Sequence, residues 1–77
     1  MTRNLQIEQL IDIISDTLAG AYNLSAAARG AMREGNRNLA IGTLLPLEAQ
    51  LETAMALHRS VLALHQHSRV DAKAGEP

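Results

Sequence analysis

Three arginines spaced four residues apart are the side chains best suited to bind an anion in this 77-residue chain. Arg29, Arg33 and Arg37 fall within the stretch ARGAMREGNRN. Residues four apart on a continuous helix share a face, so Arg29 and Arg33 can together contact phosphate groups. Arg37 joins them only if the chain folds back suitably after Gly35. The stretch is therefore a candidate nucleic-acid-binding site.

The same arginines also fit a structural role at the end of a helix. Cations near a helix C-terminus interact favourably with the helix dipole and keep that end soluble. Glu8, Asp12 and Asp16 lie near the opposite end of the same expected helix, where negative charge is favoured. We favour this structural role, because no nucleic-acid-binding motif accompanies the arginines. Two antiparallel copies of such a helix would also bring opposite charges together.

The three histidines are spaced in a way that argues against a metal site. His58 and His65 are seven residues apart, which places them on one face of a helix but about 10 Å from each other. His65 and His67 point to nearly opposite sides. Histidine-rich zinc motifs such as H-E-x-x-H are absent from the sequence. We therefore expect no metal and no cofactor, and we expect His58 and His65 to set register or pack at the edge of a core.

Catalytic chemistry has little support in the sequence. Glu48 and Glu52 form a carboxylate pair one helical turn apart, and with Arg59 they follow the charge order of a solvated helix face. The sequence carries no glycine-rich phosphate loop and no nucleophile elbow. We predict that the chain is not an enzyme.

The composition restricts the chain to a small helical class. It has no cysteine, a single aromatic residue (Tyr22) and a net charge of −1. Disulfides and thiol chemistry are thereby excluded, and no global field attracts the chain to nucleic acid or to a membrane. The N-terminus does not resemble a signal peptide, and no apolar run is long enough to span a bilayer. We expect a soluble cytoplasmic protein.

The first half of the chain has the 3.5-residue repeat of a packed helix, from about residue 5 to residue 34. The repeating positions are Ile7, Ile11, Ile14, Leu18, Ala21, Ser25, Ala28 and Met32, with Leu10, Thr17, Leu24 and Ala31 beside them. Asn4 is the expected N-cap, and Gly35 fits the left-handed position just past a helix end. Gly20 and Gly30, within the helix, predict close approach of another helix, more strongly at Gly20.

A loop at 35–38 and a second helix at about 39–67 complete an antiparallel hairpin. The expected apolar residues of the second helix include Leu44, Leu47, Leu51, Ala54, Met55, Val61 and Leu62. Pro46 interrupts the pattern, and we favour a kink there over a short helix followed by a new one capped by Thr43. Residues 68–77 are polar and small, which predicts a disordered tail after a single domain at 1–67.

Each helix carries more apolar residues than one neighbouring helix can cover. The simplest cover is a second copy, so we predict an all-α hairpin that forms a four-helix bundle, with a dimer favoured over a higher helical oligomer. The expected interface residues are Leu10, Ile13, Leu24, Leu45, Leu57, His58, Leu64 and His65. The predicted function is a protein-interaction module that acts as a regulator, adaptor or inhibitor. A nucleic-acid-binding bundle that uses the three arginines is the alternative.

Overall fold

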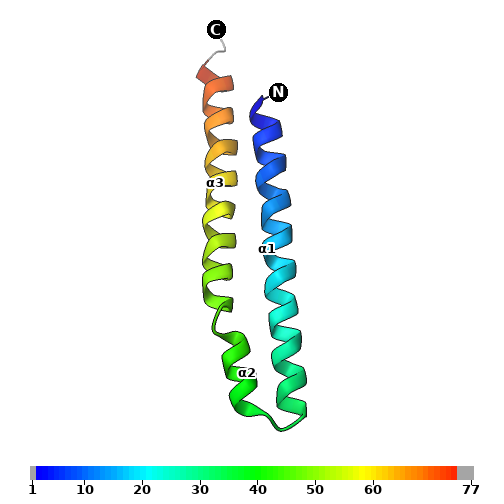
Figure 1. The fold of residues 1–77 in the computed structure, drawn as a ribbon. Helices are drawn as coiled ribbons and strands as arrows, with labels where there is room; N and C mark the ends of the chain where they lie inside the picture. The colour runs from blue at the N-terminus through cyan, green and yellow to red at the C-terminus, as the bar shows by residue number, and fades with distance from the viewer. Residues whose placement is uncertain (1, 75–77) are drawn as a thin grey trace.

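The computed structural model is one long antiparallel helical hairpin (Figure 1). The structure describes the backbone of residues 2–74 and the side chains of residues 4–67. Helix α1 spans Thr2–Arg33, α2 spans Arg37–Leu44 and α3 spans Leu47–Ala74. Helices α2 and α3 follow each other along α1 as one bent helix (Figure 1), and no strand occurs within residues 2–74. The prediction of an all-α hairpin is confirmed.

The hairpin is a rod rather than a sphere. Its principal extents are 66 × 16 × 13 Å, and its radius of gyration is 18.2 Å. A compact domain of this length would have a radius of gyration of about 11 Å. The chain therefore exposes an unusually large share of its side chains, and no second layer of helices within residues 2–74 covers the two broad sides of the rod.

The bend between α1 and α2 is held by local hydrogen bonds. Gly35 has a φ of 79°, in the left-handed region that glycine adopts without strain. Its N–H donates to the carbonyl of Met32 at 2.9 Å, and the N–H of Asn36 donates to the carbonyl of Ala31 at 2.8 Å. The side chain of Asn36 then caps α2 by accepting from the N–H of Leu39 at 3.1 Å. The left-handed position predicted for Gly35 is confirmed, whereas the predicted loop at 35–38 is too long, because α2 already begins at Arg37.

The second half of the hairpin bends at Pro46, as predicted, but the helix is also interrupted there, since α2 ends at Leu44 and α3 begins at Leu47. Proline has no N–H, so the carbonyl of Gly42 loses the donor that a continuous helix would supply. The N–H of Leu45 donates to that carbonyl instead, at 3.3 Å, while Leu45 keeps helical angles of φ −54° and ψ −42°. Thr43 does not cap a new helix, because its hydroxyl donates to the carbonyl of Leu39 at 2.7 Å within α2.

Several predicted helix limits need correction. Helix α1 begins at Thr2, so Asn4 lies inside the helix and is not its N-cap. The first turn of α1 contains no acidic residue, whereas its last turn contains Arg33. The dipole explanation therefore holds for Arg33 but not for the acidic residues farther along α1. Helix α3 continues to Ala74, past the predicted limit at residue 67, and the rest of the predicted tail lies outside the described residues.

The line of α1 that contacts the other helices differs from the predicted one. The prediction correctly placed four residues on this line: Ile7, Ile14, Ala21 and Ala28. Between these four, the line contains residues of a neighbouring row in place of the predicted ones. The buried or half-buried line of α1 is Ile7, Leu10, Ile14, Thr17, Ala21, Leu24, Ala28 and Ala31. The predicted Ile11, Leu18, Ser25 and Met32 are exposed. Two adjacent rows both follow the 3.5-residue repeat, and only packing decides which one turns inward.

The interior of the hairpin is made of alanine. Among the described residues, the buried ones are Ala21, Ala28, Ala31, Ala40 and Ala54. Ala28, Ala31 and Ala40 form one cluster near the bend, with Leu44 packed against it. Such small side chains let the helices approach closely, but they bury little apolar area compared with leucine or isoleucine. The large apolar side chains lie half-buried along the seam or exposed outside it.

The two glycines within α1 have different surroundings. A Cβ atom at Gly20 would lie 3.3 Å from the side-chain oxygen of Gln50, so α3 approaches α1 closely there, as predicted. A Cβ atom at Gly30 would meet nothing within 4 Å. The weaker prediction of close approach at Gly30 is therefore wrong within the hairpin, because α2 lies on another side of α1 at that level.

Candidate protein-interaction surface

Six large aliphatic side chains of α1 and α3 lie outside the seam on one side of the hairpin, and we call them the apolar face. They are Ile11, Leu18 and Met32 of α1 and Leu51, Met55 and Leu62 of α3. Each is between 45% and 54% exposed. Unlike isolated surface leucines, these residues recur in rows along both helices, which is the arrangement typical of a binding surface.

The helical repeat explains why these residues share one side. On α1, Ile11 and Leu18 each follow a residue of the inward line by one position, a turn of about 100° in one sense. On α3, Leu51 and Met55 follow the inward-facing Gln50 and Ala54 in the same way. Two antiparallel helices are related by a two-fold axis perpendicular to the plane that contains them, and this axis maps each broad side of the hairpin onto itself. A step of one residue past the inward line therefore leads to the same broad side on α1 and on α3.

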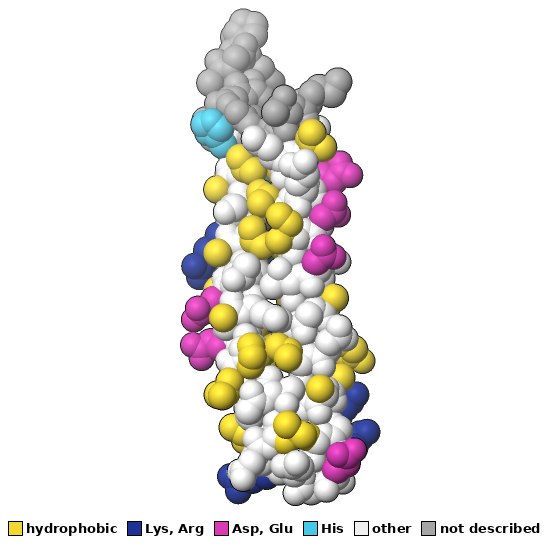
Figure 2. All heavy atoms as spheres, viewed as in Figure 1, with side chains coloured by type: hydrophobic (Ala, Val, Ile, Leu, Met, Phe, Trp, Pro, Cys, Tyr) yellow, Lys and Arg dark blue, Asp and Glu magenta, His cyan; other side chains and the backbone are white. Residues whose placement is uncertain are grey.

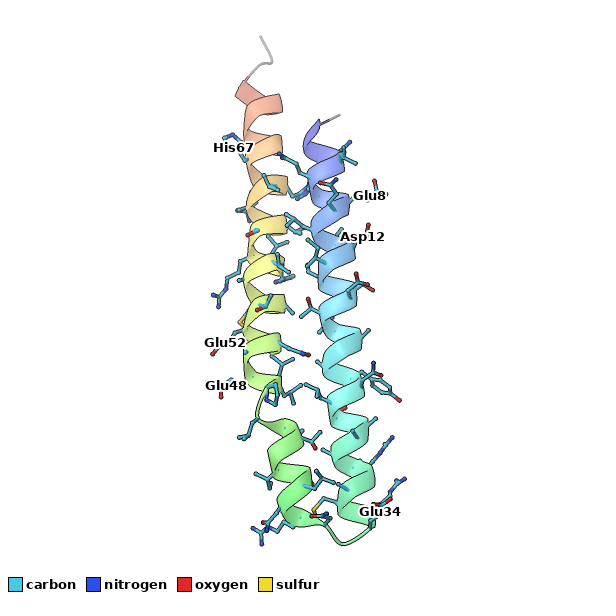
Figure 3. The ribbon with its side chains drawn as sticks, viewed as in Figure 1. Glu8, Asp12, Glu34, Glu48, Glu52 and His67 are labelled. Carbon is cyan, nitrogen blue, oxygen red and sulfur yellow. The ribbon has the colours of Figure 1, made fainter. Side chains whose placement is uncertain are left out.

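A groove lies beside the apolar face where α2 meets α3. It has a volume of about 400 Å³ and is lined by Leu44, Leu47, Glu48, Leu51, Glu52 and Met55. Its apolar wall continues the apolar face, since Leu51 and Met55 belong to both. Glu48 and Glu52 point outward from α3 at its rim (Figure 3). The bend at Pro46 therefore adds a concave, acid-rimmed region near the middle of this side of the hairpin.

The opposite side of the hairpin is built from small and polar residues. A second hollow there, of about 290 Å³, is lined by Asp16, Thr17, Gly20, Ala49, Gln50 and Thr53. The side-chain oxygen of Gln50 is buried without a hydrogen-bond partner. Of the large apolar residues in α1, Ile13 lies on this side, 48% exposed. The two sides of the hairpin thus differ strongly in their apolar content.

The charged side chains lie along the edges. Glu8 and Asp12 point outward from the N-terminal half of α1 (Figure 3). Basic side chains near the bend occupy two separate places, on the α1 edge and beneath α2 (Figure 2). Arg29 and Arg33 belong to α1, whereas Arg37 begins α2 on the other side of the bend, and all three are exposed.

The eight predicted interface residues fall into two groups. Leu10, Leu24, Leu57 and Leu64 are half-buried on the seam between α1 and α3, whereas Ile13, Leu45, His58 and His65 are exposed. His58 and His65 follow Leu51 at intervals of seven residues, so they extend its row toward the open end of the hairpin. The apolar face itself was missed as a surface, because its residues had been assigned to the seam within the hairpin. The sequence signal for this face is a second apolar row on α1, which follows the inward-facing row by one residue.

Within the described part of the chain, no group of three or more histidine or carboxylate side chains is arranged to hold a metal ion. None of its helices combines the length and the apolar character needed to cross a membrane. Comparison with known proteins finds no matching family model, curated protein or solved structure.

Proposed function

We propose that this chain is a small non-catalytic helical module that self-associates and works by binding protein, as a regulator, adaptor or inhibitor. The observation that carries the proposal is the inverted distribution of apolar residues. The buried positions hold alanine, while twelve larger apolar residues (eleven aliphatic and Tyr22) are at least 45% exposed. A hairpin that folds alone would place its largest side chains inside.

Covering the apolar face gains enough free energy to drive association. Each fully buried leucine, isoleucine or methionine contributes roughly 1.5–3 kcal/mol, and the six residues of the face are about half exposed. Two copies that covered this face would gain roughly 9–18 kcal/mol. Association costs about 4–15 kcal/mol in lost freedom of motion. The gain is therefore of the size needed for a stable complex.

The arrangement of the polar residues supports binding rather than catalysis. The carboxylates labelled in Figure 3 lie along the edges and do not converge on a shared point. Both hollows are open and shallow, and neither is lined by a histidine. Catalytic sites gather a nucleophile, a base and a stabilising group within hydrogen-bond reach of one another.

The direct test is the molar mass in solution. Light scattering at micromolar concentration is expected to give at least twice 8.3 kDa, and the melting temperature is expected to rise with protein concentration. A monodisperse 8.3 kDa species whose melting temperature is independent of concentration would contradict self-association.

A further inference from the structure

We propose that the apolar face is occupied by a second copy of this chain, with the two α1 helices antiparallel and a two-fold axis beside Leu18. The proposal rests on the self-association proposed above and adds its surface, partner and orientation. Three observations carry it: the spacing of charges on α1, the pairing of large with small residues, and the area of the face.

The charges beside the apolar face on α1 are self-complementary. Glu8 and Arg29 occupy the same side of the helix, 21 positions apart, with their midpoint between residues 18 and 19. In an antiparallel pair centred at Leu18, Glu8 therefore lies opposite the partner's Arg29, and Arg29 opposite the partner's Glu8. Both residues are exposed in the single hairpin. Paired charges of this kind select orientation more than they add affinity.

Large and small residues alternate about the same centre. Ile11 and Ser25 are equally far from Leu18 along α1, so an antiparallel pair places each isoleucine over the partner's serine. Tyr22 and Ser15 are related in the same way about the midpoint of Glu8 and Arg29. Large side chains opposite small ones let two helices interdigitate without voids.

Helix α3 continues this symmetry. The contact between Gly20 and Gln50 fixes the axial alignment of α1 and α3. Because the helices are antiparallel, that contact places Leu18 level with the residue after Leu51. Leu18 and Leu51 consequently lie close to the same two-fold axis, and with their copies they form a four-leucine layer at the centre of the bundle.

The alternative two-fold axis, along the length of the hairpin, fits less well. It would lay α1 over the partner's α3, with both bends at the same end. With the axial alignment that the contact between Gly20 and Gln50 sets, Glu8 would face the partner's Leu62 and Arg29 would face the partner's Ile41. Glu8 and Arg29 would then lose the mutual pairing that the proposed axis gives them.

The face is large enough for a stable dimer. The rod measures 66 Å by 16 Å across this broad side, or about 1,000 Å² in projection. Specific interfaces of standard size bury about 800 Å² on each partner. A second hairpin of the same dimensions covers the whole face, including the groove beside Pro46.

The sharpest test compares two isoleucines on the same helix. Ile11 is 50% exposed on the apolar face, and Ile13 is 48% exposed on the opposite side. Ile11→Glu is expected to raise the dimer dissociation constant about a hundredfold or more, because each dimer would bury two carboxylates. Ile13→Glu is expected to change it less than about threefold. Analytical ultracentrifugation measures both, and circular dichroism checks that both variants remain helical.

The outcomes separate the two proposals. A wild-type monomer would overturn the proposed self-association, and the docking proposal with it. A wild-type oligomer that resists Ile11→Glu, or that is equally sensitive to Ile13→Glu, would overturn the docking face alone. A dimer in which only Ile11→Glu causes dissociation supports the face, whichever way the two hairpins are oriented.

Orientation and contact are tested by crosslinking, which also covers the case that Ile11→Glu unfolds. The natural chain has no cysteine, so single cysteines report one position each. With a short bismaleimide, Leu18→Cys is expected to give at least tenfold more crosslinked dimer than Asn23→Cys, an exposed control on the other side. A mixture of Ile11→Cys and Ser25→Cys is expected to crosslink between the two variants. Equal yields from Leu18→Cys and Asn23→Cys would overturn the proposed axis.

Discussion

Gln50 and Gly20 meet at the middle of the hairpin, where the side-chain oxygen of Gln50 lies 3.3 Å from the place a Cβ of Gly20 would occupy. The same oxygen is buried and has no hydrogen-bond partner. A buried polar atom without a partner costs about 1–3 kcal/mol. This close approach of α1 and α3 therefore also lowers the stability of the hairpin.

Replacing Gln50 by methionine is expected to raise the free energy of unfolding by about 1 kcal/mol, because it removes the unpaired amide at nearly constant volume. Urea unfolding at a fixed protein concentration measures the change. Gln66→Met, at an exposed position of α3, is the control and is expected to have no clear effect. A loss of stability in Gln50→Met would show that the amide has a partner in solution.

Two glycine substitutions are expected to have opposite effects. Gly30→Ala adds a methyl group in open space on α1 and is expected to stabilise the helix by about 1 kcal/mol. Gly35→Ala is expected to destabilise the hairpin by about 1 kcal/mol, because the bend requires a φ of 79°. Thermal melts of the two variants at one concentration compare them directly. Destabilisation by Gly30→Ala would reveal a close contact at that position in the assembly.

Replacing His58 by leucine is expected to tighten the proposed dimer by about tenfold, because leucine would continue the row that begins at Leu51. Ser60→Leu adds the same side chain on the opposite side of α3 and is the matched control. Sedimentation equilibrium measures both dissociation constants. Equal tightening by the two substitutions would indicate general stickiness rather than a defined face.

Replacing Arg29, Arg33 and Arg37 together by glutamine tests the nucleic-acid alternative. Exposed charges of this kind contribute roughly 0.3–1 kcal/mol each, so folding and self-association are expected to survive. Titration with mixed RNA and DNA oligonucleotides at two salt concentrations is expected to give no appreciable binding for either protein. Salt-sensitive binding by the wild type that disappears in the variant would favour the nucleic-acid function instead.

The features predicted correctly from the sequence are those with local causes. Gly35 and Asn36 specify the bend through their own backbone and side-chain hydrogen bonds, and Pro46 bends the helix because it lacks a donor. The choice between Leu10 and Ile11 as the inward residue has no local cause. Both residues are large and apolar, and both rows have the same repeat. Only the packing of the other helices of the hairpin against α1 decides between them. The extension of α3 to Ala74 was missed because that segment is polar and lacks an apolar repeat.

The capped bend also has a kinetic consequence. It joins α1 and α2 through three residues, so the contacts among Ala28, Ala31 and Ala40 close a very short loop at small entropic cost. Contacts at the open end, such as those near Ile7 and Leu64, close a loop of more than fifty residues. The hairpin is therefore expected to zip from the bend outward, as chains dominated by short-range contacts do, and to fold quickly. Its open end, where the last contacts form, is expected to be the first to fray and to exchange its amide hydrogens.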